Sequence, residues 1–175
     1  MKAVLALAAR LTLAAGLVLS AAPAALAQDE VIPFAPDDAA MEAALAKARA
    51  TLPLFLAHAL DDDGYGVEGA VVKVGFPAQG ATDMSVEHIW VAPFARDADG
   101  GFVGLLANAP VDLGDLQQGD RVEFSEDMIS DWHLTAPSGL YWGSYTSRVM
   151  HGAGAFGDTP FEQIFEAEPV PQDWR

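Results

Sequence analysis

The sequence predicts an α+β fold, in which one or two N-terminal helices pack on one face of an antiparallel sheet of about five or six strands. Apolar residues recur every three or four positions between residues 37 and 60, as on one face of an amphipathic helix. After residue 64, short runs rich in β-branched and aromatic residues alternate with turns rich in Gly, Pro and Asp. A helical region followed by closely spaced strands favours an antiparallel sheet backed by helix.

The helical region begins near Asp37 and Asp38, which can cap a helix and place negative charge at its first turn. The apolar positions that define its buried face are Met41, Leu45, Ala48 and Leu52. Pro53 either kinks this helix or begins a second short helix that carries Leu54, Phe55 and Leu56 inward. The run from Asp61 to Gly64 ends the helical region.

Six runs are predicted as strands: residues 67–76, 87–94, 102–106, 121–124, 128–134 and 140–150. Residues 97–101 have turn composition, so the second and third runs are expected to form a hairpin. After a glycine-rich connector, Thr159 is expected to cap a last short helix with Pro160 at its first position. The Pro-rich acidic tail from Glu166 is expected to be loose.

Residues 1–27 have the pattern of a cleaved signal peptide. Lys2 and Arg10 form a basic start, residues 11–22 are almost wholly apolar, and the Ala-Leu-Ala run at 25–27 predicts cleavage before Gln28. The alternative is a retained membrane anchor, but the 17 apolar residues of 11–27 fall short of the about 20 that a spanning helix needs. We therefore expect an exported protein without a stable membrane anchor, periplasmic if the host has an outer membrane.

Cleavage would leave an extended lead-in (28–36), a single α+β domain (37–150) and a glycine-rich loop, short helix and acidic tail (151–175). Seven basic and 25 acidic residues then remain, a formal net charge of −18. This charge disfavours nucleic acid and favours a protein partner with a cationic surface, although solubility alone would also explain it. The chain has no cysteine, which excludes disulfides and thiol chemistry.

The common catalytic and cofactor-binding motifs are either absent from the sequence or lack the structural context that they require. We therefore expect no cofactor and no metal. The G-x-G-x-x-G match at 152–157 lacks the βαβ context of a dinucleotide site. A calcium loop through Gly64 would place Ala59 and Ala70 at its two end positions, where neither can act as a side-chain ligand. The H-E-x-x-H and G-x-S-x-G patterns are absent.

Two segments stand out as candidate sites, and the first is residues 87–91. In a strand, Glu87, Ile89 and Val91 share one face, while His88 and Trp90 share the other. A core tryptophan beside a hydrogen-bonded histidine is the favoured interpretation. A ligand-contacting ridge is the alternative.

The second segment is Ile129-Ser130-Asp131-Trp132, in which structural use is again favoured because Ser and Asp are good turn and capping residues. Taken in order with Glu87-His88-Ile89-Trp90-Val91, this string resembles the YegJ-like family of bacterial domains of unknown function, over roughly residues 40–150. The resemblance implies a small α+β domain without an established reaction, in a group where some similar domains are associated with toxin immunity. It transfers no catalytic residue.

Two functional hypotheses follow. The first is a non-catalytic binding domain, inhibitor-like or immunity-like, with these candidate contact residues: Glu87, His88, Trp90, Asn108, Asp131 and Trp132. The alternative is a small hydrolase or metal-assisted enzyme, with Glu87 or Asp131 as the general base and His88 as acid or ligand. A third possibility places the partner contacts in the tail after Glu166.

Overall fold

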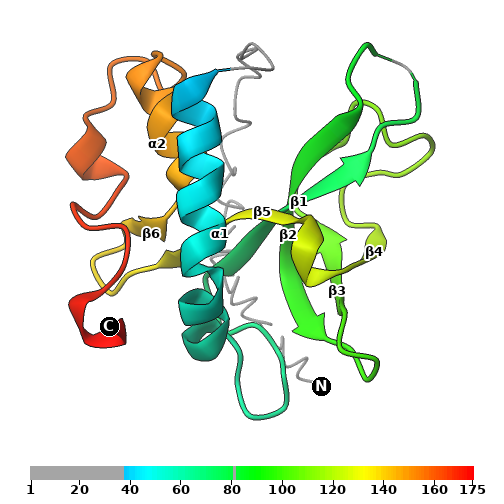
Figure 1. Ribbon diagram of the computed structural model, residues 1–175, viewed down its shortest axis with the longest axis horizontal. Coiled ribbons are helices and arrows are strands. Elements are labelled where there is room, and N and C mark those ends of the chain that lie inside the picture. The colour runs from blue at the N-terminus through cyan, green and yellow to red at the C-terminus, as the bar shows by residue number, and fades with distance from the viewer. Residues whose placement is uncertain (1–37, 81) are drawn as a thin grey trace, which may run out of the picture.

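A computed structural model describes residues 38–80 and 82–175. The predicted signal peptide and the lead-in lie outside the described residues. Helix α1 (Ala39–Ala59) packs across one face of a six-stranded antiparallel sheet, as Figure 1 shows, and this arrangement confirms the predicted α+β class.

The sheet has β1 near its centre. Its strands are β1 (Ala70–Pro77), β2 (Val86–Arg96), β3 (Phe102–Leu106), β4 (Arg121–Phe124), β5 (Ile129–Thr135) and β6 (Tyr141–Gly143). Their order is β4-β3-β2-β1-β5-β6, and β2 and β3 form the predicted hairpin. Because β1 pairs with both β2 and β5, the two candidate segments lie on the two strands that flank β1.

Helix α1 begins after Asp38, as the sequence predicted. The Asp38 carboxylate caps the helix by accepting a hydrogen bond from the backbone N–H of Met41 at 2.9 Å. Pro53 lies inside this single continuous helix, so it begins no second one. The helix ends at Ala59, and the Asp61 carboxylate then holds the following turn by accepting from the backbone N–H of Tyr65 at 2.8 Å.

The core lies between α1 and the sheet. Phe55 and Trp132 are fully buried and stack with their ring centroids 4.7 Å apart. The Trp132 indole N–H donates to the carbonyl of Ala48 and to the Thr51 hydroxyl, both at 3.2 Å. Trp132 therefore joins β5 to α1 by packing and by hydrogen bonds.

The prediction of one strand over residues 140–150 is wrong. Strand β6 stops at Gly143, and residues Tyr145–Gly152 form a second helix, α2. Gly143 and Ser144 both have left-handed backbone angles, which turn the chain out of the sheet. A buried carboxylate from β5, that of Asp131, then accepts the first amides of the helix. Tertiary contacts thus override the strand preference of this run.

The C-terminal tail is ordered rather than loose. Its short 3-10 helices are η2 (Phe161–Gln163) and η3 (Gln172–Trp174), and Pro160 rather than Thr159 stands at the N-cap of η2. The Trp174 ring stacks on His58 of α1 at 4.5 Å. The tail therefore packs against α1.

Arg148 of α2 fastens the tail to β6. Its guanidinium donates to the carbonyls of Gly143 (2.7 Å), Glu166 (2.9 Å) and Tyr141 (3.1 Å). The N–H of Gly143 also donates to the carbonyl of Pro169 at 2.7 Å. The tail runs beside β6 through these contacts, so this edge of the sheet is closed.

We predict that Gly143→Ala destabilises the fold by about 3 kcal/mol, because a Cβ there would lie 2.3 Å from the Trp132 carbonyl and φ is +69°. Gly139→Ala is the matched control, since φ is +86° there but no atom lies within 4 Å of the added Cβ. The control should lose only about 1 kcal/mol. Urea unfolding of both variants checks this, and equal losses would contradict the close approach.

Candidate functional site

Glu87 is buried and holds a loop. Its two carboxylate oxygens accept from the backbone N–H groups of Val111 and Asp112, each at 2.7 Å. Asp112 is also buried, and its carboxylate accepts from the N–H (2.8 Å) and the hydroxyl (2.6 Å) of Thr82. The two carboxylates link the loop after β3 to the loop before β2, so Glu87 is fully engaged in structure.

Asp131 is likewise buried, and it caps α2 from outside the helix. It accepts from the backbone N–H groups of Trp132 (2.8 Å), Tyr145 (3.2 Å) and Thr146 (2.7 Å), and from the Thr146 hydroxyl (2.6 Å). Burial raises the pKa of this carboxyl above its usual value, while nearby Lys73 and these hydrogen bonds oppose the rise. Four donors on one carboxylate leave it poorly placed to act as a general base.

Two further predicted residues have structural positions. Trp132 is part of the core, with no exposed surface. The Asn108 side-chain oxygen accepts from the backbone N–H of Trp90 at 3.2 Å, just beyond the β2–β3 pairing. Trp132 therefore offers no surface to a ligand, whereas Asn108 is half-buried.

His88 and Trp90 share one face of β2, as the alternation predicted, and this is the face away from α1. The tryptophan of the core is thus Trp132 and not Trp90, which is half-buried. His88 Nδ1 lies 2.8 Å from the Ser130 hydroxyl, which itself donates to the Lys73 carbonyl at 3.1 Å. Because that hydroxyl hydrogen is used, Nδ1–H of His88 is the donor to Ser130, and Nε2 is left as an acceptor.

Three residues that the sequence analysis did not select join them on this face. The Lys73 ammonium lies 4.6 Å from the centre of the Trp90 ring, His133 lies 4.9 Å from Trp90, and Tyr141 lies 4.7 Å from His133. We call these residues the basic–aromatic face: Lys73, His88, Trp90, His133 and Tyr141. The strand register could have indicated it, since Lys73 stands directly opposite Trp90.

Charge on this face belongs mainly to Lys73. Its ammonium donates to the Thr146 hydroxyl at 3.3 Å, and that hydroxyl donates to Asp131, so the cation is coupled to the buried carboxylate. Burial, aided by Lys73, lowers the pKa of His133 to about 4, and burial also lowers the pKa of His88. Both imidazoles are therefore neutral near pH 7. Of the five residues, His88 is exposed and Trp90 and Tyr141 are half-buried, so these three rings are the part of the face that can stack against a ligand or form hydrogen bonds with it.

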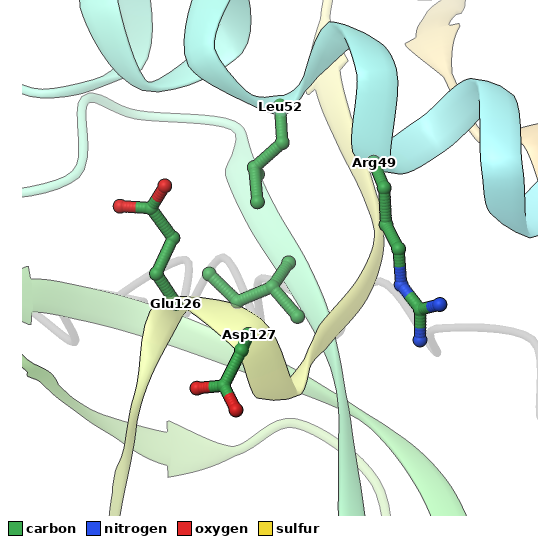
Figure 2. A pocket seen from close by; sticks show the side chains of 5 residues that line it. Arg49, Leu52, Glu126 and Asp127 are labelled. Carbon is green, nitrogen blue, oxygen red and sulfur yellow. The ribbon is translucent and has the colours of Figure 1, made fainter.

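A shallow pocket of 460 Å³ lies between α1 and the 3-10 helix η1 (Glu126–Met128). Leu52 and Ile129 line this pocket together with three charged residues. Figure 2 shows Glu126 and Asp127 on one side of Leu52, with their carboxylates pointing in different directions, and Arg49 on the other side. Leu52 and Ile129 are buried, whereas the three charged residues are exposed. The pocket thus has an apolar floor and a charged rim.

Other kinds of site find no support within residues 38–80 and 82–175. This part of the chain holds no group of three or more His, Asp or Glu side chains arranged to bind a metal ion. Neither of its α-helices combines the length and the apolar character that crossing a bilayer requires.

The fold and the site define a small α+β domain in which the carboxylates of Glu87 and Asp131 are both held by backbone amides. The family described as "Uncharacterized protein conserved in bacteria (DUF2314)" matches residues 38–155, more than half of the chain. The chain belongs to this family. This match confirms the expectation that the chain belongs to an uncharacterised family of bacterial domains.

A relative from Neisseria meningitidis serogroup B, named "Putative ankyrin repeat protein", is 34% identical over 84 residues. The match covers 47% of this chain and 32% of the relative, so the chain spans about a third of that protein's length. No solved structure matches the chain.

We predict that His133 makes the fold less stable as the pH falls. The unfolded chain binds a proton at this imidazole near pH 6.5, but the folded chain binds it only near pH 4. The contribution of neutral His133 to the free energy of unfolding is therefore complete above about pH 6.5, and it is lost as the pH falls toward about 4.

The variant His133→Phe should flatten the decrease in unfolding free energy between these two pH values. Urea unfolding at half-unit pH steps measures the slope, and some slope should remain because the pKa of His88 is also lowered. Identical slopes in the variant and the parent chain would contradict the assignment.

Proposed function

We propose that this protein is an exported, non-catalytic binding domain whose ligand is a protein with a cationic surface, as an inhibitor or immunity-like protein would bind. The distribution of charge supports this. Among the 22 acidic residues of the described part, all but Glu87, Asp112 and Asp131 are exposed or half-exposed. Of the seven basic residues, Lys73 is buried and Arg148 is half-buried beneath the tail. The surface is therefore strongly anionic.

The hydrolase alternative receives no comparable support. Glu87 and Asp131 each hold two or more backbone amides, and Glu87 and His88 lie on opposite faces of β2. The Ser130 hydroxyl donates to a backbone carbonyl and is buried, which leaves it unsuited as a nucleophile. The resemblance to the YegJ-like family is consistent with the binding proposal, because that family has no established reaction.

The shallow pocket is the place where we expect a basic side chain of the partner. The methylene groups of a lysine or arginine can lie on Leu52 and Ile129. Its charged end then reaches the carboxylate of Glu126, which lies beside Leu52 (Figure 2) and 3.9 Å from Arg96, or that of Asp127. A charge-assisted hydrogen bond to one of these carboxylates would fix its position, and the other would add to the local negative charge. Arg49 on the opposite rim can donate to a carbonyl of the same partner.

We expect the chain to leave the cytoplasm and to lose residues 1–27. Fractionation of the source cells, followed by mass measurement of the intact protein, should find a species that starts at Gln28 outside the cytosol. An uncut chain in the cytosol would contradict export.

Electrostatic steering should govern association with the partner. A protein retained from an envelope extract by the immobilised chain should associate at least about tenfold more slowly when the ionic strength rises from about 0.05 to 0.5 M. An association rate that does not depend on salt would overturn the proposed function.

The double variant Glu126→Gln/Asp127→Asn should weaken that complex by about tenfold or more, because it removes both carboxylates of the pocket rim. The matched control, Asp158→Asn/Glu162→Gln, removes two exposed carboxylates elsewhere and should change mainly the association rate. Equal effects of the two variants in a surface plasmon resonance titration would contradict the pocket as the contact point.

A further inference from the structure

The two edges of the sheet differ. At β6, the N–H of Tyr141 donates to the carbonyl of Ile164 at 2.9 Å and the N–H of Glu166 donates back to Tyr141 at 3.1 Å, so the tail covers this edge. At the opposite edge, β4 pairs with β3 on its inner side (Figure 1). Among the described residues, no backbone hydrogen bond reaches its outer side. One edge is closed and the other is open.

The hydrogen bonds of β3 show which backbone groups of β4 face outward. Leu106 of β3 donates to the carbonyl of Asp120 at 3.0 Å, and Gly104 stands opposite Val122. Backbone groups alternate in direction along a strand, so Asp120, Val122 and Phe124 bond inward to β3. The N–H and C=O groups of the two residues between them point to the open edge.

These two residues are Arg121 and Glu123. Their side chains are exposed by 62% and 68%, and they lie on the sheet face away from α1, since Val122 is buried against the core. Within one chain they form an ion pair at 2.8 Å. The open edge therefore presents four backbone groups and one charge of each sign.

We propose that β4 pairs with β4 of a second copy, antiparallel and about a two-fold axis at Val122. This register places Arg121 opposite Glu123 of the second copy, and Glu123 opposite its Arg121. Each pair exchanges two backbone hydrogen bonds, so the outward groups are all used, and each sets opposite charges side by side. An axis at Arg121 or at Glu123 would instead oppose like charges. The edge is self-complementary in one register only.

The dimer is weak. Proteins commonly protect an open edge by making it short and charged, and β4 has only four residues. A strand pairing of this length buries little surface, so we expect a Kd on the order of 100 µM. The charges of β4 therefore select a second copy in one register and disfavour other edges.

Analytical ultracentrifugation of the full chain, purified from cells and studied at about 10–1,000 µM in about 0.15 M salt, tests the proposal. The parent chain should pass from monomer to dimer over this range. Arg121→Glu should raise the Kd about tenfold because it sets carboxylates opposite each other, and Arg121→Glu/Glu123→Arg should restore it. The control Arg175→Glu makes the same change in net charge as the single reversal, outside β4, and should leave the Kd nearly unchanged.

A second variant tests the backbone part of the interface. Glu123→Pro removes an N–H that points to the open edge and has no backbone partner within residues 38–80 and 82–175, so the monomer should fold while the dimer is lost. Urea unfolding confirms that the monomer is intact. A parent chain that stays monomeric throughout, a single reversal that matches the control, or a double reversal that fails to restore pairing would overturn the proposal.

Discussion

The buried carboxylate of Asp131 is the interaction on which the C-terminal half of the structure depends. A charged group removed from water is costly unless hydrogen bonds replace the lost solvation, and four donors do so here. Three of these donors belong to the first turn of α2. That helix carries Arg148, which in turn holds the tail against β6. The Asp131 carboxylate thus fixes where α2 begins. Through Arg148 of that helix, it also supports the closure of the sheet edge at β6.

The local parts of the fold could be predicted well from the sequence. The bounds of β3 and β4 agree with the predicted runs, and the face alternation of Glu87 and His88 in β2 is as expected. Both follow from composition and period alone. The α2 helix could not be predicted in this way, because its start depends on Asp131, a residue 14 positions away. The ordered tail was missed for the same reason, since its contacts are with β6 and α1.

The candidate site shows a similar division. A sequence pattern can place a carboxylate in a strand, but it does not show whether backbone amides from a distant loop occupy its oxygens. Glu87 meets such amides at Val111 and Asp112, and for this reason the two most attractive acidic residues proved structural. The basic–aromatic face arises from register across four strands, β1, β2, β5 and β6. The sequence alone places Lys73 in a strand, but only the register of β1 against β2 places it opposite Trp90.

The tail also completes a sheet that the family match does not complete by itself. The family match ends at residue 155, yet the tail residues beyond it shield the last strand of the sheet. Without residues 164–169, the backbone groups of Tyr141 and Gly143 in β6 would lose these hydrogen-bond partners, and the sheet would have two open edges instead of one. The segment beyond the family match is thus part of the folding unit in this chain, and removing it would make the protein prone to pair at both ends of its sheet.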